Sequence, residues 1–334
     1  MSCLAGTSAQ AANKATIVKN SKSNYRIVVA ANPLPAEKTA ATQLQKYINQ
    51  ITGCTLPIVP DAMPATKNEI LIGSTNRDNN AIYKAREKAD LEGYAIAWQG
   101  NKLFVTGSGE FHGRGTLYGV YELLRLMGCE FYATDTETVP HTRTLTIAKL
   151  DTTYVPPFEN RDTYWSCTYD PEISAKLHLN GMFSKTDRRT LTKQWGGGVS
   201  YAGPQAVHTF DKLVPPEKYF ESHPEYFSEI GGKRTAKHLY SQLCMTNPEV
   251  LHIVIDSVRQ WLRNDPESSI VSVSQNDSFV IDSYCTCAKC KAINDAEGSP
   301  MGAMLRFVNA VADSIKGEFP HAAVDLLAYQ YSIT

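Results

Sequence analysis

The sequence predicts an α/β protein in which a small N-terminal α/β sandwich domain precedes a partial TIM-type (β/α) barrel. Strand and helix patterns alternate up to about residue 150 and again after residue 157, which favours two layered α/β domains. Two prolines, Pro156 and Pro157, separate the two series. Because proline resists both helix and central strand, this pair is typical of a linker.

Residues 23–150 form the first predicted domain. Apolar residues at helical spacing predict a helix over residues 36–51, which Gly53 ends. Runs of β-branched and alternating residues predict strands, and the turn at residues 99–101 joins two of them into a hairpin. The predicted strands are residues 25–31, 57–60, 69–73, 93–98 and 102–106, and the other helices are residues 78–90 and 111–127.

The glycines at residues 107–115 do not form a dinucleotide-binding motif. The G-x-G-x-x-G pattern requires glycine at position 112, where this sequence has His112. No P-loop motif occurs either. We therefore expect these glycines to shape a strand-to-helix turn, and we expect no cofactor.

Residues 157–334 form the second predicted domain, whose alternating strands and helices are typical of a parallel sheet. Asn247 suits a cap and Pro248 a first turn, so the helix over residues 248–264 is strongly indicated. A complete barrel takes about 250 residues, and the sequence stops inside an apolar strand. We therefore expect an incomplete barrel in a C-terminally truncated chain. The predicted strands are residues 158–165, 179–183, 206–210, 269–277 and 323–331, and the other helices are residues 171–178, 216–222 and 300–317.

The charge balance argues against a nucleic-acid partner. The sequence has 33 basic and 34 acidic side chains, a net charge of -1, so it offers no bulk attraction to polyanions. It also has no run of 18 apolar residues, so we expect no transmembrane segment.

The N-terminal residues 1–22 are rich in small and polar side chains, and we expect them to be a disordered signal remnant or linker. Residues 9–11 have a small-x-small cleavage pattern, and Cys3 suits lipidation, although the apolar segment of a signal peptide is absent. We expect an extracytoplasmic protein, periplasmic or a surface lipoprotein. An ordinary flexible terminus is the alternative.

Polar and aromatic side chains follow the predicted strands of the barrel. In such barrels the functional groups gather at the carboxyl ends of the strands. Hydroxyl-rich sugars require paired donors and acceptors together with flat apolar faces, and these residue types supply both. The candidate substrate-binding residues are Arg161, Asp162, Tyr164, Trp165, His208, Asn276 and Tyr329.

Asp277 is the candidate catalytic residue. Hydrolysis of a glycosidic bond usually requires a carboxylic acid that protonates the leaving oxygen, and Asp277 lies at the polar end of the strongly predicted strand over residues 269–277. The second carboxylate is Asp162 or Asp211, or is absent. Each residue also has a structural interpretation: Asp277 as a loop brace, His208 as a hydrogen-bonded core histidine, and Arg161 as the partner of Asp162 or another carboxylate.

Three of the eight cysteines, Cys285, Cys287 and Cys290, form a C-x-C-x-x-C cluster. Such spacing suits zinc, a disulfide or free thiols that brace a loop. A structural zinc site requires four ligands. Cys244 or a histidine could supply the fourth, but the sequence alone does not designate it, so no residue is assigned to a metal.

Several short motifs of the second domain form a recognisable set: the C-x-C-x-x-C cluster and residues 208–210, 215–220, 223–227, 232–234, 242–244, 246–248, 274–277 and 307–309. In these motifs the second domain resembles an uncharacterised domain family of bacterial carbohydrate-active proteins that is related to alpha-glucuronidases. The first domain resembles the domain that precedes the barrel in alpha-glucuronidases and beta-hexosaminidases. There the resemblance rests on Glu37, Ala40, Leu44 and residues 70–73 and 114–119.

The resemblance implies that the first domain is not catalytic and that the barrel binds sugar at its carboxyl rim. Arg161 resembles the arginine that grips a sugar hydroxyl in beta-hexosaminidases. Those enzymes carry an Asp-Glu pair after a middle strand, where this chain has Asn276 and Asp277. That departure argues against hexosamine specificity.

The leading hypothesis is a glycoside hydrolase that cleaves O-glycosyl bonds of polysaccharides or glycans by carboxylate acid/base chemistry. The alternative is a non-catalytic carbohydrate-binding protein, which shares the aromatic rim but needs no pair of carboxylates. A metal-dependent hydrolase built on the cysteine cluster is a third hypothesis.

Overall fold

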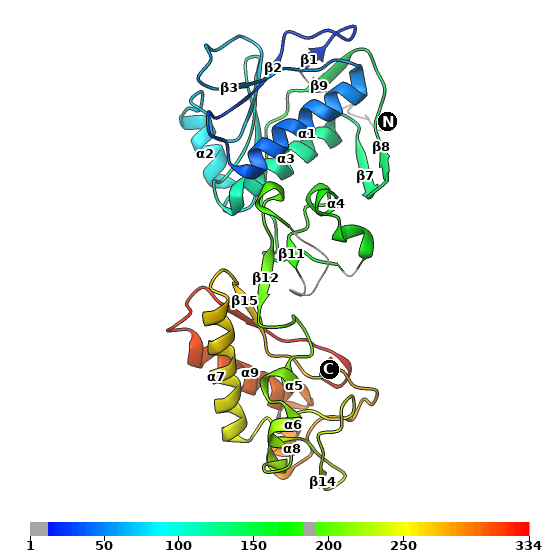
Figure 1. Cartoon of the computed structure of the whole chain (residues 1–334), viewed down its shortest axis with the longest axis vertical. Coiled ribbons are helices and arrows are strands. Elements are labelled where there is room, and N and C mark those ends of the chain that lie inside the picture. Colours follow the sequence, from blue (N-terminus) through cyan, green and yellow to red (C-terminus); the bar gives the residue numbers. More distant parts are fainter. Residues whose placement is uncertain (1–12, 164, 183–190, 334) are drawn as a thin grey trace, which may run out of the picture. The chain divides into compact units, whose positions relative to one another are not determined.

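The computed structural model describes residues 13–163, 165–182 and 191–333, in which the chain divides into two compact units (Figure 1). Unit 1 comprises residues 1–181 and 188–198, and unit 2 comprises residues 182–187 and 199–334. The division therefore falls later in the chain than the proline pair. Residues 157–181, which the sequence analysis assigned to the second domain, belong to unit 1.

Unit 1 is built on a six-stranded mixed sheet. Its strands are β2 (Arg26–Val29), β3 (Ile58–Pro60), β4 (Glu69–Ile72), β5 (Tyr94–Gln99), β6 (Lys102–Gly107) and β10 (Thr152–Tyr154), in the spatial order β10-β5-β6-β4-β2-β3. β3, β2, β4 and β6 run parallel, whereas β5 is antiparallel to both of its neighbours. β2, β3, β4, β5 and β6 correspond to the five strands that the sequence predicts for the first domain.

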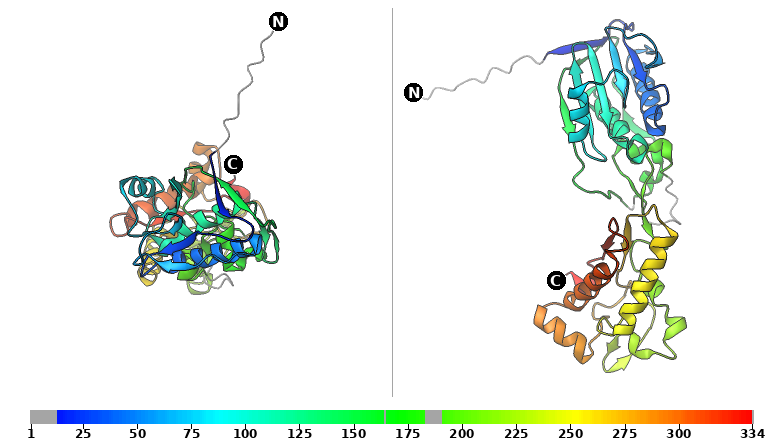
Figure 2. Two further views of the ribbon diagram at one scale, coloured as in Figure 1. Left: turned by 90° about the horizontal axis from the view of Figure 1, so that it is seen from above. Right: turned by 90° about the vertical axis from the view of Figure 1, so that its left-hand side faces the viewer.

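Helices cover both faces of this sheet. They are α1 (Pro35–Thr52), α2 (Asn80–Lys88) and α3 (Arg114–Leu126). Successive side chains of a strand point to opposite faces, so Ile27 and Ile70 pack in one cluster with α1 and α3. Val28 and Leu71 pack on the other face with Ile82 of α2. The predicted α/β sandwich is thus confirmed (Figure 2).

The glycines between β6 and α3 shape the strand-to-helix turn, as predicted. Gly113 has a φ of 87°, a left-handed conformation that side chains rarely adopt. A Cβ atom on Gly115 would clash with the carbonyl oxygen of Gly93. These positions therefore require glycine for backbone reasons, without any ligand.

The prediction that residues 1–22 do not pack is wrong for the strand β1 (Lys14–Val18). β1 pairs antiparallel with β9 (Leu145–Ala148), and Ile17 and Val18 are buried in the core of unit 1. The partner strand lies about 130 residues away in the sequence, so the local composition of the terminus does not reveal the pairing. A second small hairpin in this unit joins β7 (Glu130–Ala133) to β8 (Thr136–Thr138).

The strand predicted over residues 158–165 is absent from the described residues of that segment. The N–H of Arg161 donates to Oδ1 of Asn180 at 2.8 Å, and its carbonyl accepts from the N–H groups of Asn180 and Gly181. The side chain of Asn180 thus accepts the hydrogen bond from the backbone N–H of Arg161 that a neighbouring strand would otherwise accept. The helix α4 (Pro171–Lys176) follows, as predicted.

Unit 2 is built on parallel strands joined by helices. The strands are β12 (Val199–Ala202), β15 (Ile270–Ser272) and β16 (Ala323–Asp325), and the sheet order is β11-β12-β15-β16, with β11 (Gly181–Met182) at the boundary between the units. β12, β15 and β16 run parallel. The βα order is the one predicted, but over the described residues the sheet is open and does not close into a barrel.

Two amphipathic helices, α7 (Pro248–Asn264) and α9 (Met301–Ile315), supply much of the core of unit 2. Val258 of α7 and Phe307 of α9 are buried with Val271 of β15. Shorter elements lie between them: α5 (Phe210–Leu213), α6 (Pro216–Tyr219), β13 (Glu229–Ile230), β14 (Lys233–Arg234) and α8 (Ala288–Glu297). Among the described residues, no helix is long and apolar enough to cross a membrane.

The strand predicted over residues 206–210 is wrong, because the chain makes a turn there and then enters α5. His208 has a φ of 55°, which is incompatible with a strand. The strand of this region is β12, which ends at Ala202, before the predicted segment begins. Short 3-10 helices complete the chain: η1 (Phe111–Gly113), η2 (Ser166–Tyr169), η3 (Lys193–Trp195), η4 (Pro224–Tyr226) and η5 (Gln330–Ser332).

Candidate functional site

A cavity of about 650 Å³ lies in unit 2 beside the chain that leaves β15. His208, Asp211, His238, Asn276 and Asp277 are among the residues that line it. Because β15 is parallel to its neighbours, this is the carboxyl edge of the sheet, where α/β proteins bind ligands. Three residues that the sequence predicted, His208, Asn276 and Asp277, therefore share one cavity.

Thr209 fastens the turn before α5 to the end of β15. Its hydroxyl donates to the carbonyl of Ser272 at 2.9 Å and accepts from the N–H of Ser274 at 2.9 Å. Its own N–H donates to the carbonyl of Ser274 at 3.0 Å. Since Thr209 is fully buried, these bonds hold the neighbouring His208 and Asp211 close to residues 274–277.

Asp211 and Asn276 bind each other in both directions. The N–H of Asp211 donates to Oδ1 of Asn276 at 2.9 Å, and Nδ2 of Asn276 donates to Oδ1 of Asp211 at 2.6 Å. The second carboxylate oxygen of Asp211 lies 3.5 Å from Nδ1 of His238. Asp211 therefore sits between an amide and an exposed imidazole.

Gln242 fixes the backbone of Asn276 from the other side. Its Oε1 accepts from the N–H of Asn276 at 2.7 Å, and its Nε2 donates to the carbonyl of Asn276 at 3.0 Å. Both residues are buried. The side-chain amide of Gln242 thus bonds both backbone groups of Asn276, as a neighbouring strand would, and fixes the backbone next to Asp277.

The two carboxylates of the cavity have different environments. Burial raises the pKa of Asp211 above its ordinary value, although hydrogen bonds from Asn276 and His238 act in the opposite direction. Asp277 is half-buried, and its Oδ1 accepts from the N–H of Ser278 at 2.9 Å. A carboxyl group whose pKa is raised by burial thus shares a cavity with a second carboxyl group, that of Asp277.

His208 and Tyr329 lie together at this edge. Their rings meet edge to face, with centroids 5.6 Å apart. Nδ1 of His208 bonds to the carbonyl of Gln275 at 3.0 Å, and since a carbonyl can only accept, Nδ1 is the donor. Nε2 of Gln275 donates to the carbonyl of Tyr329 at 2.8 Å and fixes the backbone of that residue.

Arg161, Asp162 and Trp165 lie in unit 1. Trp165 is 73% exposed, and the predicted Tyr164 is outside the described residues. Oδ1 of Asp162 accepts from the N–H of Thr163 at 2.6 Å. Arg161 pairs with Glu92, its Nη2 lying 2.9 Å from Oε1 of that residue. The structure thus divides the predicted site residues between the two units.

Glu92 is a central residue of unit 1 that the sequence did not predict. Besides Arg161 it binds Arg114, and Nδ2 of Asn180 donates to both of its carboxylate oxygens at 2.8 and 3.1 Å. Glu92 and Arg114 are almost completely buried. This network supports the structural interpretation of Arg161 as an ion-pair partner, with Glu92 in place of Asp162. A lone glutamate before a strand carries no local signal of such a network.

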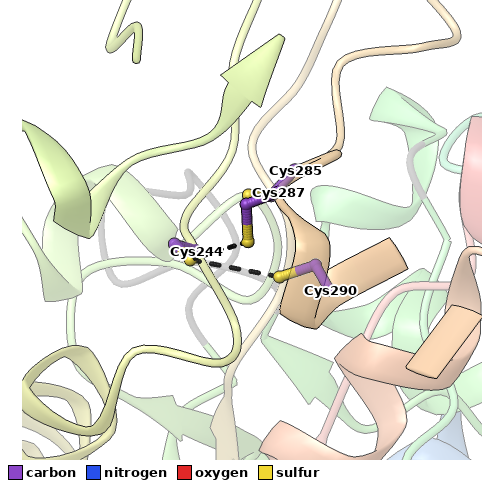
Figure 3. Close-up of side chains that lie close together, drawn as sticks. All are labelled: Cys244, Cys285, Cys287 and Cys290. Carbon is purple, nitrogen blue, oxygen red and sulfur yellow. Dashed lines mark hydrogen bonds between the residues drawn. The ribbon is translucent and has the colours of Figure 1, made fainter. Parts of the chain in front are cut away.

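The residues that could hold a metal ion are four cysteines of unit 2. The sulfur atoms of Cys244, Cys285, Cys287 and Cys290 all lie within 4.8 Å of one another (Figure 3). The structure thus places Cys244 with the C-x-C-x-x-C cluster, an arrangement that the sequence analysis left open. The disulfide interpretation is wrong for the described cysteines, since all seven are free thiols.

Two family profiles match the chain. The profile described as "Domain of unknown function (DUF4838)" matches residues 131–334, and "Glycosyl hydrolase family 67 N-terminus" matches residues 9–123. No curated protein sequence matches the chain. The predicted relation of the first domain to alpha-glucuronidases is confirmed by the second profile.

Solved structures resemble the fold at low sequence identity. A chitobiase from Flavobacterium johnsoniae superposes with a TM-score of 0.50 at 12% identity, over 94% of this chain and 50% of that chain. A family GH115 4-O-methyl-alpha-glucuronidase gives 0.48 at 13% identity, over 95% and 43% of the two chains. The GH20 beta-N-acetylhexosaminidase of Streptomyces coelicolor A3(2) gives 0.44 at 13% identity, over 94% and 64%.

The likeness to the chitobiase shows a shared α/β fold, and the chain spans about half the length of that enzyme. The DUF4838 profile covers more than half of the chain and includes every described residue around the cavity and the four clustered cysteines. The chain therefore belongs to the DUF4838 domain family, and its first unit is similar to the N-terminus of glycosyl hydrolase family 67 over residues 9–123.

Proposed function

We propose that this chain is a glycoside hydrolase in which Asp211 and Asp277 form the pair of catalytic carboxylates. The observation that carries the proposal is that both line one cavity at the carboxyl edge of the parallel sheet. Glycosidases use two carboxyl groups that flank the scissile bond. The glycosyl hydrolase family 67 profile over unit 1 supports the same class of enzyme.

The environments of the two groups suggest their roles. A general acid must be protonated at the working pH, and burial favours this form of Asp211. The sequence predicted Asp277 as the acid, but the raised pKa of Asp211 favours Asp211 for that role and leaves Asp277 as the base or nucleophile. A separation of about 5–5.5 Å would make the enzyme retaining, and about 6.5–9.5 Å inverting.

Neighbouring side chains suit a sugar. His208 and the amide of Asn276 offer polar groups beside the carboxylates. The ring of Tyr329 lies against His208 and offers a flat apolar face of the kind that sugar rings contact. We propose polysaccharides or glycans as substrates.

A carbohydrate-binding protein without turnover is the second candidate, and one observation favours it. Both carboxylate oxygens of Asp211 already have partners. Oδ1 of Asp211 accepts from Nδ2 of Asn276, and Oδ2 of Asp211 lies next to Nδ1 of His238. Such a carboxylate suits a structural role as well as an acid role. In that case Asp277 and Tyr329 would bind sugar without catalysing hydrolysis.

Hydrolysis assays with the full chain separate the two candidates. A panel of aryl glycosides and polysaccharides, including glucuronides and N-acetylglucosaminides, would be scored for released product and, by calorimetry, for binding. We expect hydrolysis that Asp211→Asn and Asp277→Asn each lower by at least about 100-fold. Asp282→Asn, an exposed carboxylate in the same loop, is the matched control and should leave the rate unchanged. Binding without hydrolysis would establish the second candidate instead.

A further inference from the structure

We propose that Cys244, Cys285, Cys287 and Cys290 bind one Zn²⁺ ion in a closed, tetrahedral, structural site. No part of the proposed hydrolase function requires this site, and the inference rests on the geometry of unit 2 alone. All four side chains are buried, with exposed fractions between 1% and 8%. Four cysteines gathered in a protein interior are the usual ligand set of structural zinc.

The spacing of the sulfur atoms fits a single ion. Zinc–sulfur bonds of about 2.3 Å in a tetrahedron place neighbouring sulfurs about 3.8 Å apart. Sγ of Cys244 lies 3.8 Å from Sγ of Cys287 and 4.0 Å from Sγ of Cys290 (Figure 3). A disulfide would bring two sulfurs to about 2.05 Å, and a cluster of several irons would need more room than sulfurs within 4.8 Å leave.

The ligands come from two separate segments, as in zinc sites that join loops. Cys244 precedes Asn247, the cap of α7. Cys285 and Cys287 lie in the loop before α8, and Cys290 lies in the first turn of that helix. The x-x spacing between Cys287 and Cys290 is the one that lets a loop and a helix start grip the same ion.

Outer groups orient the sulfurs as they do around zinc thiolates. The N–H of Glu229 donates to Sγ of Cys285 at 3.3 Å, and Nη1 of Arg234 lies 3.6 Å from the same atom. The hydroxyl of Thr246 lies 3.3 Å from Sγ of Cys290. Four thiolates and Zn²⁺ carry a net charge of −2, which the Arg234 guanidinium partly offsets. Such partners stabilise and orient metal ligands.

The site would stabilise the segment that supports the cavity. Gln242, which fixes the backbone of Asn276 with two hydrogen bonds, lies two residues before Cys244. Thr286, between two ligands, donates through its N–H and its hydroxyl to the carbonyl of Glu229, at 2.8 and 2.7 Å. Since four protein ligands leave no open position for water or substrate, the ion would be structural and not catalytic. This argues against the metal-dependent hydrolase hypothesis.

Metal analysis of the full chain, purified without chelator or an immobilised-metal column, tests the proposal. We expect one zinc ion per chain by mass spectrometry, and its loss in Cys287→Ser. Cys54→Ser, a half-buried cysteine of unit 1, is the matched control and should keep its zinc. Iron in place of zinc, or zinc that survives Cys287→Ser, would overturn the proposal.

A second measurement covers the case in which Cys287→Ser does not fold. Wild-type protein would be unfolded in guanidinium with a colorimetric zinc indicator and with a thiol reagent. We expect release of one zinc ion as the eight thiols of the chain, these four among them, become reactive, and we expect Co²⁺ reconstitution to give the absorption bands of tetrahedral thiolate coordination. Absence of released zinc and of these bands would overturn the proposal, whatever the outcome of the hydrolysis assays.

Discussion

Asp211 and Asn276, 65 residues apart in the sequence, exchange two hydrogen bonds: Asp211 N–H to Asn276 Oδ1 at 2.9 Å and Asn276 Nδ2 to Asp211 Oδ1 at 2.6 Å. The pair joins the start of α5 to the chain that leaves β15. It holds a half-buried carboxyl group at the cavity that Asp277 also lines.

Asn276→Ala should destabilise unit 2. The substitution removes the donor to Asp211 and a second bond to the carbonyl of Ser241 at 3.2 Å, and leaves buried polar groups without partners, at about 1–3 kcal/mol each. Urea unfolding measures the loss. Asn264→Ala, an exposed asparagine at the end of α7, should change stability by less than about 0.5 kcal/mol. Equal losses of stability in the two variants would contradict the role of Asn276 in joining the start of α5 to the chain that leaves β15.

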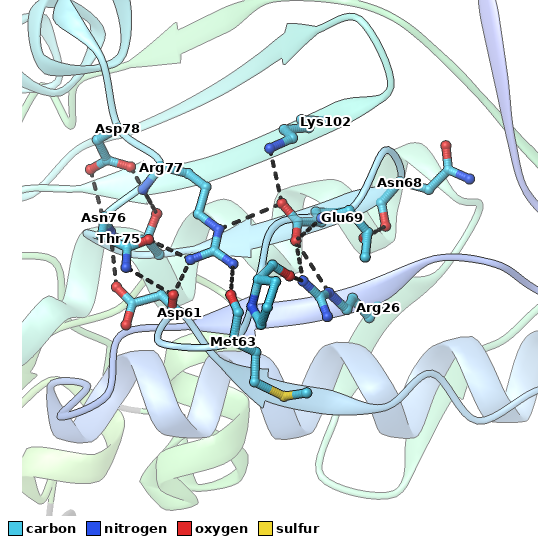
Figure 4. Close-up of polar contacts among 12 residues, drawn as sticks. Arg26, Asp61, Met63, Asn68, Glu69, Thr75, Asn76, Arg77, Asp78 and Lys102 are labelled. Carbon is cyan, nitrogen blue, oxygen red and sulfur yellow. Dashed lines mark hydrogen bonds and ion pairs between the residues drawn. The ribbon is translucent and has the colours of Figure 1, made fainter.

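Glu69 organises a cluster of cations at one end of the sheet in unit 1 (Figure 4). Its side chain is fully buried, and it pairs with Arg26 at 2.7 Å, Lys102 at 3.1 Å and Arg77 at 3.6 Å. Burial alone would raise the pKa of Glu69. The bonds from Arg26, Thr66 and Lys102 outweigh it and lower the pKa from 4.5 to about 2.

This pKa predicts acid sensitivity of unit 1. The folded state binds a proton to Glu69 less readily than the unfolded state, so the stabilisation is complete above about pH 4.5 and disappears as pH falls toward 2. The difference corresponds to roughly 3 kcal/mol. We expect Glu69→Gln to be less stable than wild type at pH 7 and to lose less stability on acidification. Glu87→Gln, exposed on α2, should follow the wild-type pH curve. Parallel curves for wild type and Glu69→Gln would contradict the assignment.

Glu92→Gln should be strongly destabilising. It removes the only negative charge that the described contacts give to the buried Arg114, and the partner of Arg161 as well. Breaking a buried ion pair costs about 3–5 kcal/mol, because a buried charge loses its partner. Glu122→Gln breaks the partly exposed pair with Arg125 at 3.7 Å and should cost at most about 1 kcal/mol. Thermal or urea unfolding compares the two, and similar losses would refute the role of Glu92.

Local signals in the sequence predict the elements that depend on local interactions. Asn247 caps α7 by accepting from the N–H groups of Glu249 and Val250, so the start of this helix can be derived from neighbouring residues. β1 depends on β9, far along the chain, and its burial therefore has no local signal. The turn at His208 likewise depends on the contacts of Thr209 with β15.

The candidate site was predictable in part for the same reason. His208, Asn276 and Asp277 each lie next to an apolar segment, and the sequence indicates them. Asp211 was only one of two options for the second carboxylate, because its burial and its bond to Asn276 arise from tertiary packing. The fourth cysteine ligand, Cys244, lies 41 residues before Cys285 in the sequence, and only the fold brings them together.

The pH dependence of hydrolysis by the full chain tests the proposed carboxylate pair most directly. If Asp211 is the acid, kcat/KM should fall as pH rises through the pKa of its carboxyl group. Asn276→Ala removes a hydrogen bond that lowers this pKa. The fall of kcat/KM on the alkaline side should therefore move to higher pH, even if the variant has a lower maximal kcat/KM. Absence of hydrolysis with every glycan, or an alkaline limb that Asn276→Ala leaves in place, would contradict the account.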